Sequence, residues 1–398
     1  MNKNMWKGEP LEARVQRLFL AQGIFAERYL QVVTGQMQSK KTATDIDVLS
    51  CEYASSFHLT RGHTECKGGS DFRILDRTFW MHGVKDLLGA SASYLVLNEY
   101  DPEVLEFARD LGIELLTLDS VEKMEASYGV PAECWPCRSN YSVFSPMLDF
   151  WRKESKRKDE SAPSRMGAML VFLEEESWLH SRYAVLNKLL RQFEILAKLS
   201  KEGQVESAPA RPLATYCAGA LTVRFAQYIM FVCRDVLTMG SLTRADYLRG
   251  RLSHGDQDRQ TARSLVQASV TMAKSALAEH KIPLPARWEV DVLLSPPPYA
   301  DSFLQLVERF VESSSDSRYA TVAAEAHHFG DQGPSMSKFP RLTAAAKAGG
   351  PFAALIRGFV VQSFGLPNEL LSPFDAKGTF DLISQVKKPL QKDLLPKE

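Results

Sequence analysis

The first 125 residues alternate between helix-type and strand-type hydrophobic spacing, and this alternation limits the folds open to the chain more than any other feature. Leu11 to Ala21 has apolar side chains on one face at helical spacing, which predicts an amphipathic helix. Three segments with the apolar and aromatic content of strands follow: Ile24 to Val33, Asp45 to Cys51 and His63 to Lys67. The region therefore begins with one helix and three strands.

Helices and strands continue to alternate up to residue 122. The predicted elements are a helix from Arg73 to Leu88, a strand from Ser93 to Asn98, a helix from Pro102 to Leu111 and a strand from Ile113 to Leu118. Asp101 followed by Pro102 is a helix cap with proline in the first turn. This order predicts an α/β domain over residues 1–130, with a mixed sheet between helices.

The rest of the chain is predicted to be all-α. Residues 131–165 are charged and contain prolines, which is typical of a linker. Residues 166–280 are predicted to form a helical bundle. Its long helices are expected at Ser177–Ser200, Tyr216–Leu237 and Gln260–His280. Residues 281–398 are predicted to form an irregular helical C-terminal region, because prolines and the pair Gly349-Gly350 interrupt its helices.

Composition excludes several classes of protein. The 398 residues are 45% hydrophobic and 24% charged, which excludes a disordered or fibrous chain. The 48 basic and 48 acidic side chains balance, so bulk charge does not indicate a nucleic-acid partner. The start of the chain has no apolar signal region, and the uncharged apolar stretch from Phe225 to Cys233 is about half a membrane span. Six cysteines do not form a disulfide-type pattern, so we expect a cytoplasmic protein with no membrane partner.

Two carboxylates and a lysine on neighbouring predicted strands are the most informative residues. Asp47 lies in one strand, and Glu65 and Lys67 lie two residues apart in the next, where both point to the same face. Adjacent antiparallel strands would place Asp47 beside Glu65 at one end of the sheet. Two carboxylates bind a hard cation through oxygen, and Mg²⁺ suits them because it keeps several water ligands. A lysine near such a water suits phosphodiester hydrolysis.

These residues resemble the PD-(D/E)XK, or restriction-endonuclease-like, nucleases, with the Mrr-like branch the most similar. The resemblance covers roughly residues 8–122 and is carried by Asp47 in TDIDVLS and by Glu65 and Lys67 in HTECKGG. It implies a Mg²⁺-dependent endonuclease, with Mn²⁺ as a substitute. Asp47 and Glu65 would hold the metal, and Lys67 would orient the water.

Two more carboxylates belong to this hypothesis. Many members of the family present a glutamate from the first helix, and Glu12 matches that position, although a glutamate on a helix surface is the alternative. Asp45 competes with Asp47 as the metal ligand. Taken alone, Glu65 and Lys67 are equally consistent with an ordinary solvated ion pair at the edge of a sheet. The preceding D-x-D segment and the succession of helices and strands favour the nuclease interpretation.

A second candidate site lies in the helical region. Arg249 and His254 occur in LRGRLSHGD, where the guanidinium would grip a phosphate and the imidazole would act as general acid or base. The segment resembles the R-x4-6-H motif of HEPN domains, all-helical bundles that are often metal-independent ribonucleases. Gly250 stands where that family usually has a polar residue. The resemblance covers roughly residues 166–280 and implies a site supplied twice across a homodimer.

The sequence therefore predicts a metal-dependent endonuclease whose helical region dimerises or recruits a partner protein. DNA is favoured over RNA because most relatives cut DNA, and fusion of a nuclease to a HEPN-like bundle suggests an anti-phage defence effector. One alternative is a metal-independent ribonuclease that uses Arg249 and His254. Another is a non-catalytic sensor or assembly protein with a degenerate nuclease domain, which the net charge of −5 over residues 1–130 favours.

Overall fold

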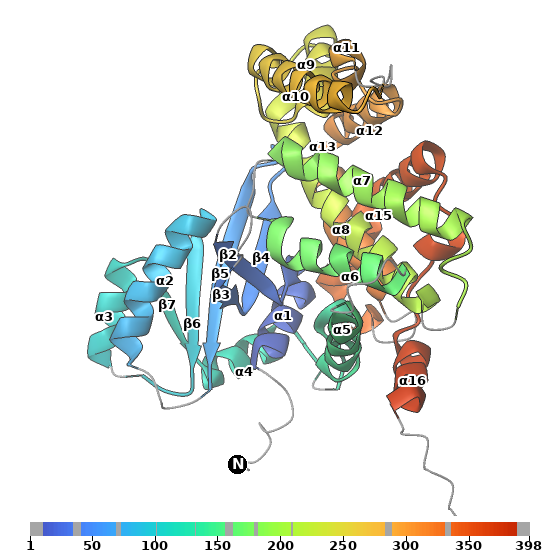
Figure 1. Ribbon diagram of the computed structural model, residues 1–398. Coiled ribbons are helices and arrows are strands. Elements are labelled where there is room, and N and C mark those ends of the chain that lie inside the picture. The colour runs from blue at the N-terminus through green and yellow to red at the C-terminus, as the bar shows by residue number, and fades with distance from the viewer. Residues whose placement is uncertain are drawn as a thin grey trace, which may run out of the picture.

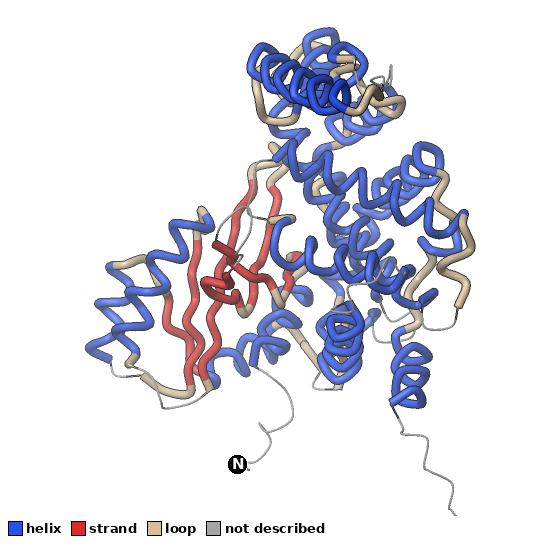
Figure 2. Tube along the Cα trace, viewed as in Figure 1, coloured by secondary structure: helices blue, strands red, loops and turns tan. Residues whose placement is uncertain are grey.

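The computed structural model describes residues 11–34, 41–68, 73–100, 102–131, 133–155, 162–178, 182–207, 210–282, 289–330 and 336–387. Its N-terminal part is a mixed five-stranded sheet with helices on both faces, and the remainder is mostly helical (Figure 1, Figure 2). The predicted succession of an α/β part and an all-α part is confirmed at this level.

The main sheet has the strand order β1-β4-β5-β6-β7. Its strands are β1 (Phe25–Glu27), β4 (Val48–Tyr53), β5 (Leu59–Lys67), β6 (Ala92–Leu97) and β7 (Glu114–Thr117). The pairs β1–β4 and β4–β5 are antiparallel, whereas β5–β6 and β6–β7 are parallel. Val48 pairs with Thr64, so the residue before β4 lies opposite Glu65 at the end of the β4–β5 ladder.

Helices cover both faces of this sheet. They are α1 (Leu11–Ala21), α2 (Ile74–Leu88), α3 (Pro102–Asp110) and α4 (Leu118–Ser127), the last of which the sequence analysis did not predict. Cys66 and Val96 pack with residues of α1 and α4, whereas Leu95 and Leu97 pack with residues of α2 and α3. The two faces therefore follow the alternation of side chains along β5 and β6.

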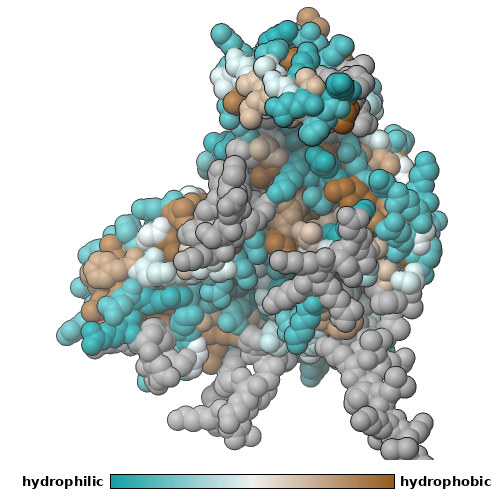
Figure 3. Space-filling model, viewed as in Figure 1, coloured by the Kyte–Doolittle hydropathy of each residue, from teal (hydrophilic) through white to brown (hydrophobic). Residues whose placement is uncertain are grey.

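The outer side of α2 is partly apolar. Leu75, Phe79 and Leu87 are 45%, 59% and 60% exposed, and the Phe79 ring lies edge-on to Phe107 of α3. Hydrophobic residues are visible on this side of the molecule in Figure 3. These side chains lie outside the core beneath α2, which contains Met81.

The segment predicted as one strand from Ile24 to Val33 is two strands in two sheets. β1 ends at Glu27, and β2 (Leu30–Thr34) pairs with β3 (Lys41–Ile46) in a separate antiparallel hairpin. Between β1 and β2, Tyr29 has a left-handed backbone with φ 66°. Apolar spacing is similar on both sides of this break, so the pattern could not show it.

Asp47 likewise lies at a break, where the sequence analysis predicted a continuous strand from Asp45 to Cys51. β3 ends at Ile46, Asp47 forms a bend, and β4 begins at Val48. The chain passes here from the small sheet to the main sheet. Strands in both sheets alternate buried and exposed side chains, because each sheet buries one face. The period-two pattern of the sequence therefore continues through the bend and does not reveal it.

Helices account for most of the chain after residue 130. Its longer elements are α5 (Tyr141–Ser155), α6 (Ala162–Val171), η3 (Phe172–Glu176), α7 (Arg182–Lys201), α8 (Ala210–Val236), α9 (Ser241–His254), α10 (Arg259–Glu279), α12 (Ala300–Glu312), α14 (Ala320–Phe329), α15 (Pro340–Phe364) and α16 (Ala376–Lys387). Shorter ones are η2 (Cys137–Ser139), α11 (Val290–Leu293), α13 (Ser314–Ser317), η5 (Met336–Lys338) and η6 (Asn368–Leu371). Figure 1 shows α9, α10, α11 and α12 together at the top of the molecule.

Two predictions about this region are wrong. α5 lies within the predicted linker, yet Phe144, Met147, Leu148 and Trp151 are buried at helical spacing. The pair at Gly349 and Gly350 does not break a helix but lies inside α15. A Cβ at Gly349 would overlap the backbone of Tyr319, so glycine permits close packing of α15 against its neighbours.

Two helices are long and apolar enough to cross a membrane by length and composition, α8 and α15. The most apolar stretch of α8 is completely buried, and that of α15 is 39% buried. α8 packs against α7, α12 and α14, and α14 packs against α15. Both helices therefore contribute to the packing of the helical part, and α8 is its central core helix.

A buried network of ion pairs joins the sheet to the helices. Glu27 of β1 binds Arg138 of η2 (Oε1–NH1 3.2 Å) and Arg224 of α8 (Oε2–NH2 2.6 Å). Arg138 in turn binds Glu325 of α14 (NH2–Oε2 2.7 Å). All four side chains are at most 13% exposed. Four elements from distant parts of the chain therefore meet in one charge-balanced cluster.

Removing one charge from this network should destabilise the fold strongly. Glu325→Gln removes one of the two carboxylates that pair with the buried Arg138. Loss of such a partner typically lowers the free energy of unfolding by about 3–5 kcal/mol. Urea unfolding followed by circular dichroism measures the change. The matched control is Glu312→Gln, which removes an exposed partner of Arg309 and should change the free energy of unfolding by no more than about 0.5 kcal/mol. Equal effects of the two variants would contradict the assigned role.

Candidate functional site

Asp47 is held at the end of the β4–β5 ladder. Its Oδ2 accepts a hydrogen bond of 2.7 Å from the backbone N–H of Cys66. This bond fixes the carboxylate beside the strand that carries Glu65 and Lys67. The neighbouring Asp45 lies in β3 opposite Gln31, and its side chain is exposed. Of the two aspartates, Asp47 is therefore the one that the fold attaches to β5.

Glu65 is the most buried member of the site, with 1% exposure. Its Oε1 forms an ion pair with Lys67 Nζ at 2.6 Å and another with the guanidinium of Arg77. Its Oε2 is buried and has no hydrogen-bond partner among the residues that the structure describes. One oxygen of this carboxylate is thus bound by two cations, and the other is left for a further ligand.

Arg77 is a site residue that the sequence analysis missed. It lies in the first turn of α2, and its guanidinium stacks over the Trp80 ring at 3.6 Å from the centroid. Cation–π contact and the ion pair to Glu65 together hold this side chain over the end of β5. An arginine in the first turn of a helix is common in sequences, so no local signal distinguished it.

Burial and neighbouring charges change the protonation of Asp47. The pKa of its carboxyl is raised to about 6, mainly by burial and to a smaller extent by the charges of Glu12 and Asp45. The Cys66 N–H bond and the charge of Lys67 act in the opposite direction. Glu12, on α1, therefore acts electrostatically on Asp47, as expected if both face one site. A bound cation would relieve this crowding.

His63 also belongs to the surroundings of the site. It precedes Glu65 by two residues on β5, is fully buried, and lies 6.2 Å from the Trp80 ring between centroids. Both ring nitrogens lack hydrogen-bond partners. Burial, and secondarily the charge of Arg77, lower its pKa to about 4, so the ring is neutral at pH 7.

The carboxylates fit a Mg²⁺ ion better than a metal that needs many protein ligands. Within the described residues, no three His, Cys, Asp or Glu side chains form a metal-binding group. Mg²⁺ commonly uses only one or two carboxylates and completes its coordination with water and substrate oxygens. The unpartnered oxygen of Glu65 and the crowded carboxylate of Asp47 suit that role.

Arg249 and His254 lie elsewhere, on α9 at the top of the molecule in Figure 1. Both line a groove of about 710 Å³, together with Arg259 and Arg263 of α10. Arg249 binds Asp301 of α12 (NH2–Oδ1 2.9 Å). A Cβ at position 250 would lie 3.1 Å from His254 Nε2, so Gly250 gives the imidazole its room.

No protein-family model matches the chain, and comparisons with curated proteins and with solved structures also give no match. Function is therefore inferred from the geometry and chemistry of the two sites.

The raised pKa of Asp47 makes a prediction about stability. Because its folded-state pKa of about 6 exceeds the ordinary 3.8, the folded chain binds this proton more tightly, and stability falls as pH rises from about 4 to 6. Asp47→Asn should therefore raise the free energy of unfolding at pH 7.5 by about 3 kcal/mol, and the gain should shrink below pH 6. Urea titrations at pH 7.5 and pH 5 measure it.

The exposed Glu52 on β4 provides the control. Glu52→Gln should change the free energy of unfolding by no more than about 0.5 kcal/mol at either pH. A destabilised Asp47→Asn variant at pH 7.5 would contradict the electrostatic description of the site.

Proposed function

We propose that the chain is a Mg²⁺-dependent nuclease that hydrolyses phosphodiester bonds, with Mn²⁺ as a substitute metal. The observation that carries the proposal is the hydrogen bond that joins Asp47 to the strand of Glu65 and Lys67, at a position where burial, and secondarily nearby carboxylates, raise the pKa of Asp47. These residues also carry the resemblance to PD-(D/E)XK nucleases. Two acidic oxygens and a cation converge at one sheet end, which is the arrangement that this reaction needs.

Each residue of the chain has a role in this mechanism. Asp47 and Glu65 would hold the metal, which activates water and offsets the charge of the phosphate. Lys67 is one-third exposed and would orient the attacking water through its ammonium group. The guanidinium of Arg77 stacks on Trp80 and pairs with Glu65, so it is fixed beside the proposed metal site. There it would hold a non-bridging phosphate oxygen. Glu12 would contribute negative charge at the edge of the site.

DNA is the proposed substrate, because most nucleases of the resembled family cut DNA. The proposed setting is the cytoplasm, and the proposed biological role is anti-phage defence, in which the helical part forms a homodimer or recruits a partner protein. A protective effect on phage plating that disappears in Lys67→Ala would support this role. Unchanged plating with the active chain would contradict it.

Cleavage assays test the proposed reaction directly. Purified chain should nick or cut plasmid DNA in Mg²⁺ or Mn²⁺ and stop in EDTA. Lys67→Ala should lower the rate by about 100-fold or more, because it removes the group that positions the water. Lys123→Ala, at an exposed lysine of α4, is the control and should cut normally. Cutting that survives EDTA or Lys67→Ala would overturn the assignment.

Calorimetric titration with Mg²⁺ distinguishes the nuclease from a non-catalytic sensor with a degenerate site. The native chain should bind the ion, and binding should weaken as pH falls below about 6, because a protonated Asp47 does not coordinate. Asp47→Asn should bind much more weakly although its fold is stabilised. Absence of Mg²⁺ binding by the native chain, together with absence of cleavage, would favour the sensor.

A second candidate function is a metal-independent ribonuclease at α9. The observation that favours it is that Arg249 and His254 line one groove with Arg259 and Arg263, so three guanidinium groups and an imidazole lie together. Guanidinium groups bind phosphates, and imidazole transfers protons near neutral pH. The groove opens on the surface, which suits a macromolecular substrate.

This second activity predicts cleavage of structured RNA in EDTA. His254→Ala should remove that cleavage, whereas His280→Ala, at an exposed histidine just after α10, should retain it. RNA that stays intact in EDTA with the native chain would exclude the α9 groove as an autonomous ribonuclease site.

A further inference from the structure

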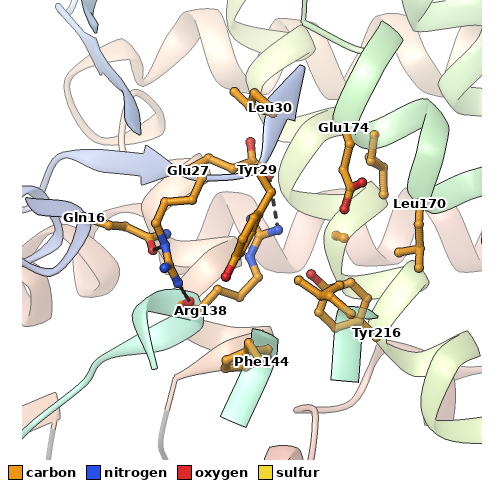
Figure 4. Close-up of a pocket in the computed structure, with 13 residues that line it drawn as sticks. Gln16, Glu27, Tyr29, Leu30, Arg138, Phe144, Leu170, Glu174 and Tyr216 are labelled. Atoms are coloured by element: carbon orange, nitrogen blue, oxygen red, sulfur yellow. Dashed lines mark hydrogen bonds and ion pairs between the residues drawn. The ribbon is translucent and has the colours of Figure 1, made fainter. Parts of the chain in front are cut away.

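A small cavity lies where β1 and β2 meet the helical part of the molecule. Its polar lining comes from Gln16, Glu27, Arg28, Tyr29, Arg138, Glu174 and Tyr216. Figure 4 shows Tyr29 from the strand side and Tyr216 from α8 on either side of the cavity, with Glu174 approaching from η3. These residues are separate from both candidate sites described above.

Within the described part of the chain, Arg28 is a buried cation without a carboxylate partner. It is 6% exposed, and its guanidinium donates to neutral oxygens: Gln16 Oε1 at 2.6 Å and the Arg138 carbonyl at 3.2 Å. No described residue places a carboxylate within ion-pair distance of it. The charge of Glu12 reaches Arg28 only over a longer distance. A buried guanidinium in this state is costly unless an anion accompanies it.

The other charges around the cavity are already paired. Arg138 and Arg224 share Glu27, and Arg138 also binds Glu325. Glu174 is bound by Arg152 at 2.7 Å. Arg152 also pairs with Asp149 at 3.1 Å. Among the described residues, Arg28 is therefore the cation of this group that no carboxylate pairs.

Tyr29 supplies a second donor to the cavity. Its hydroxyl is buried, and no described residue forms a hydrogen bond with it. Its backbone is left-handed, a conformation that a large side chain adopts only when its surroundings impose it. The break between β1 and β2 therefore places both the Arg28 guanidinium and the Tyr29 hydroxyl at the cavity.

We propose that this cavity binds one small oxyanion, which accepts hydrogen bonds from the Arg28 guanidinium and the Tyr29 hydroxyl. The cavity volume of about 40 Å³ has room for about three water molecules, which suits a phosphate or carboxylate group but excludes a whole nucleotide. The anion supplies the missing negative charge at the junction of the sheet and the helical part.

Thermal unfolding of the full chain tests the proposal. Protein dialysed into a chloride buffer is titrated with inorganic phosphate or with acetate at constant ionic strength. At least one of the two should raise the unfolding midpoint, in a saturable way, above its value in chloride. A response to phosphate alone identifies a tetrahedral phosphate group as the ligand, and a response to acetate alone identifies a carboxylate. Equal midpoints in all three salts would overturn the proposal.

Variants locate the bound anion. Tyr29→Phe removes only the hydroxyl and should weaken the affinity about tenfold, as expected for one hydrogen bond to a charged group. Arg28→Met should abolish the effect of the anion. Lys67→Ala and Arg309→Met should retain it, which separates this cavity from the proposed nuclease site and from surface arginines. If Arg28→Met does not fold, Tyr29→Phe decides, and unchanged affinity in that variant would contradict the site.

Discussion

The arrangement of the molecule depends on the buried ion network of Glu27, Arg138, Arg224 and Glu325. Charges removed from water are tolerated only when each has a partner in good geometry. Because β1, η2, α8 and α14 each contribute one charge, a shift of any one element would leave a buried charge unpaired. The network therefore fixes the sheet against the helices, and the apolar core that runs from β1 to α15 packs around that arrangement.

The candidate nuclease site differs from this network in its balance of charge. There burial raises the pKa of Asp47, and the nearby charges of Glu12 and Asp45 act in the same direction, so negative charge is crowded rather than balanced. Lys67 and Arg77 both pair with a single oxygen of Glu65. Such crowding lowers the free energy of unfolding, and the packing of the rest of the fold has to offset that cost. The contrast with the balanced network supports a functional interpretation of this end of β5.

The helices and strands around the site were predicted from the sequence more accurately than the breaks between them. The helix Leu11–Ala21 and the strand residues Glu65 and Lys67 were predicted where they occur, because amphipathic spacing and β alternation report which face is buried. The breaks at Tyr29 and Asp47 were missed, since a chain that moves between two sheets keeps the same alternation. The helix at Tyr141–Ser155 was missed because charged residues at its C-terminal end obscured its apolar stripe.

The sequence by itself determined the α/β succession, the helical remainder and the pairing of Asp47 with Glu65 and Lys67 as candidates, because these follow from local periodicity and residue chemistry. Only the tertiary structure decided that Arg77 joins them, that no described carboxylate pairs with Arg28, and that Glu27 reaches Arg224. These relationships join residues from separate elements, and their partners depend on how helices pack on the sheet. Local sequence patterns do not report that packing, and the packing decides which charges of this protein are paired and which are not.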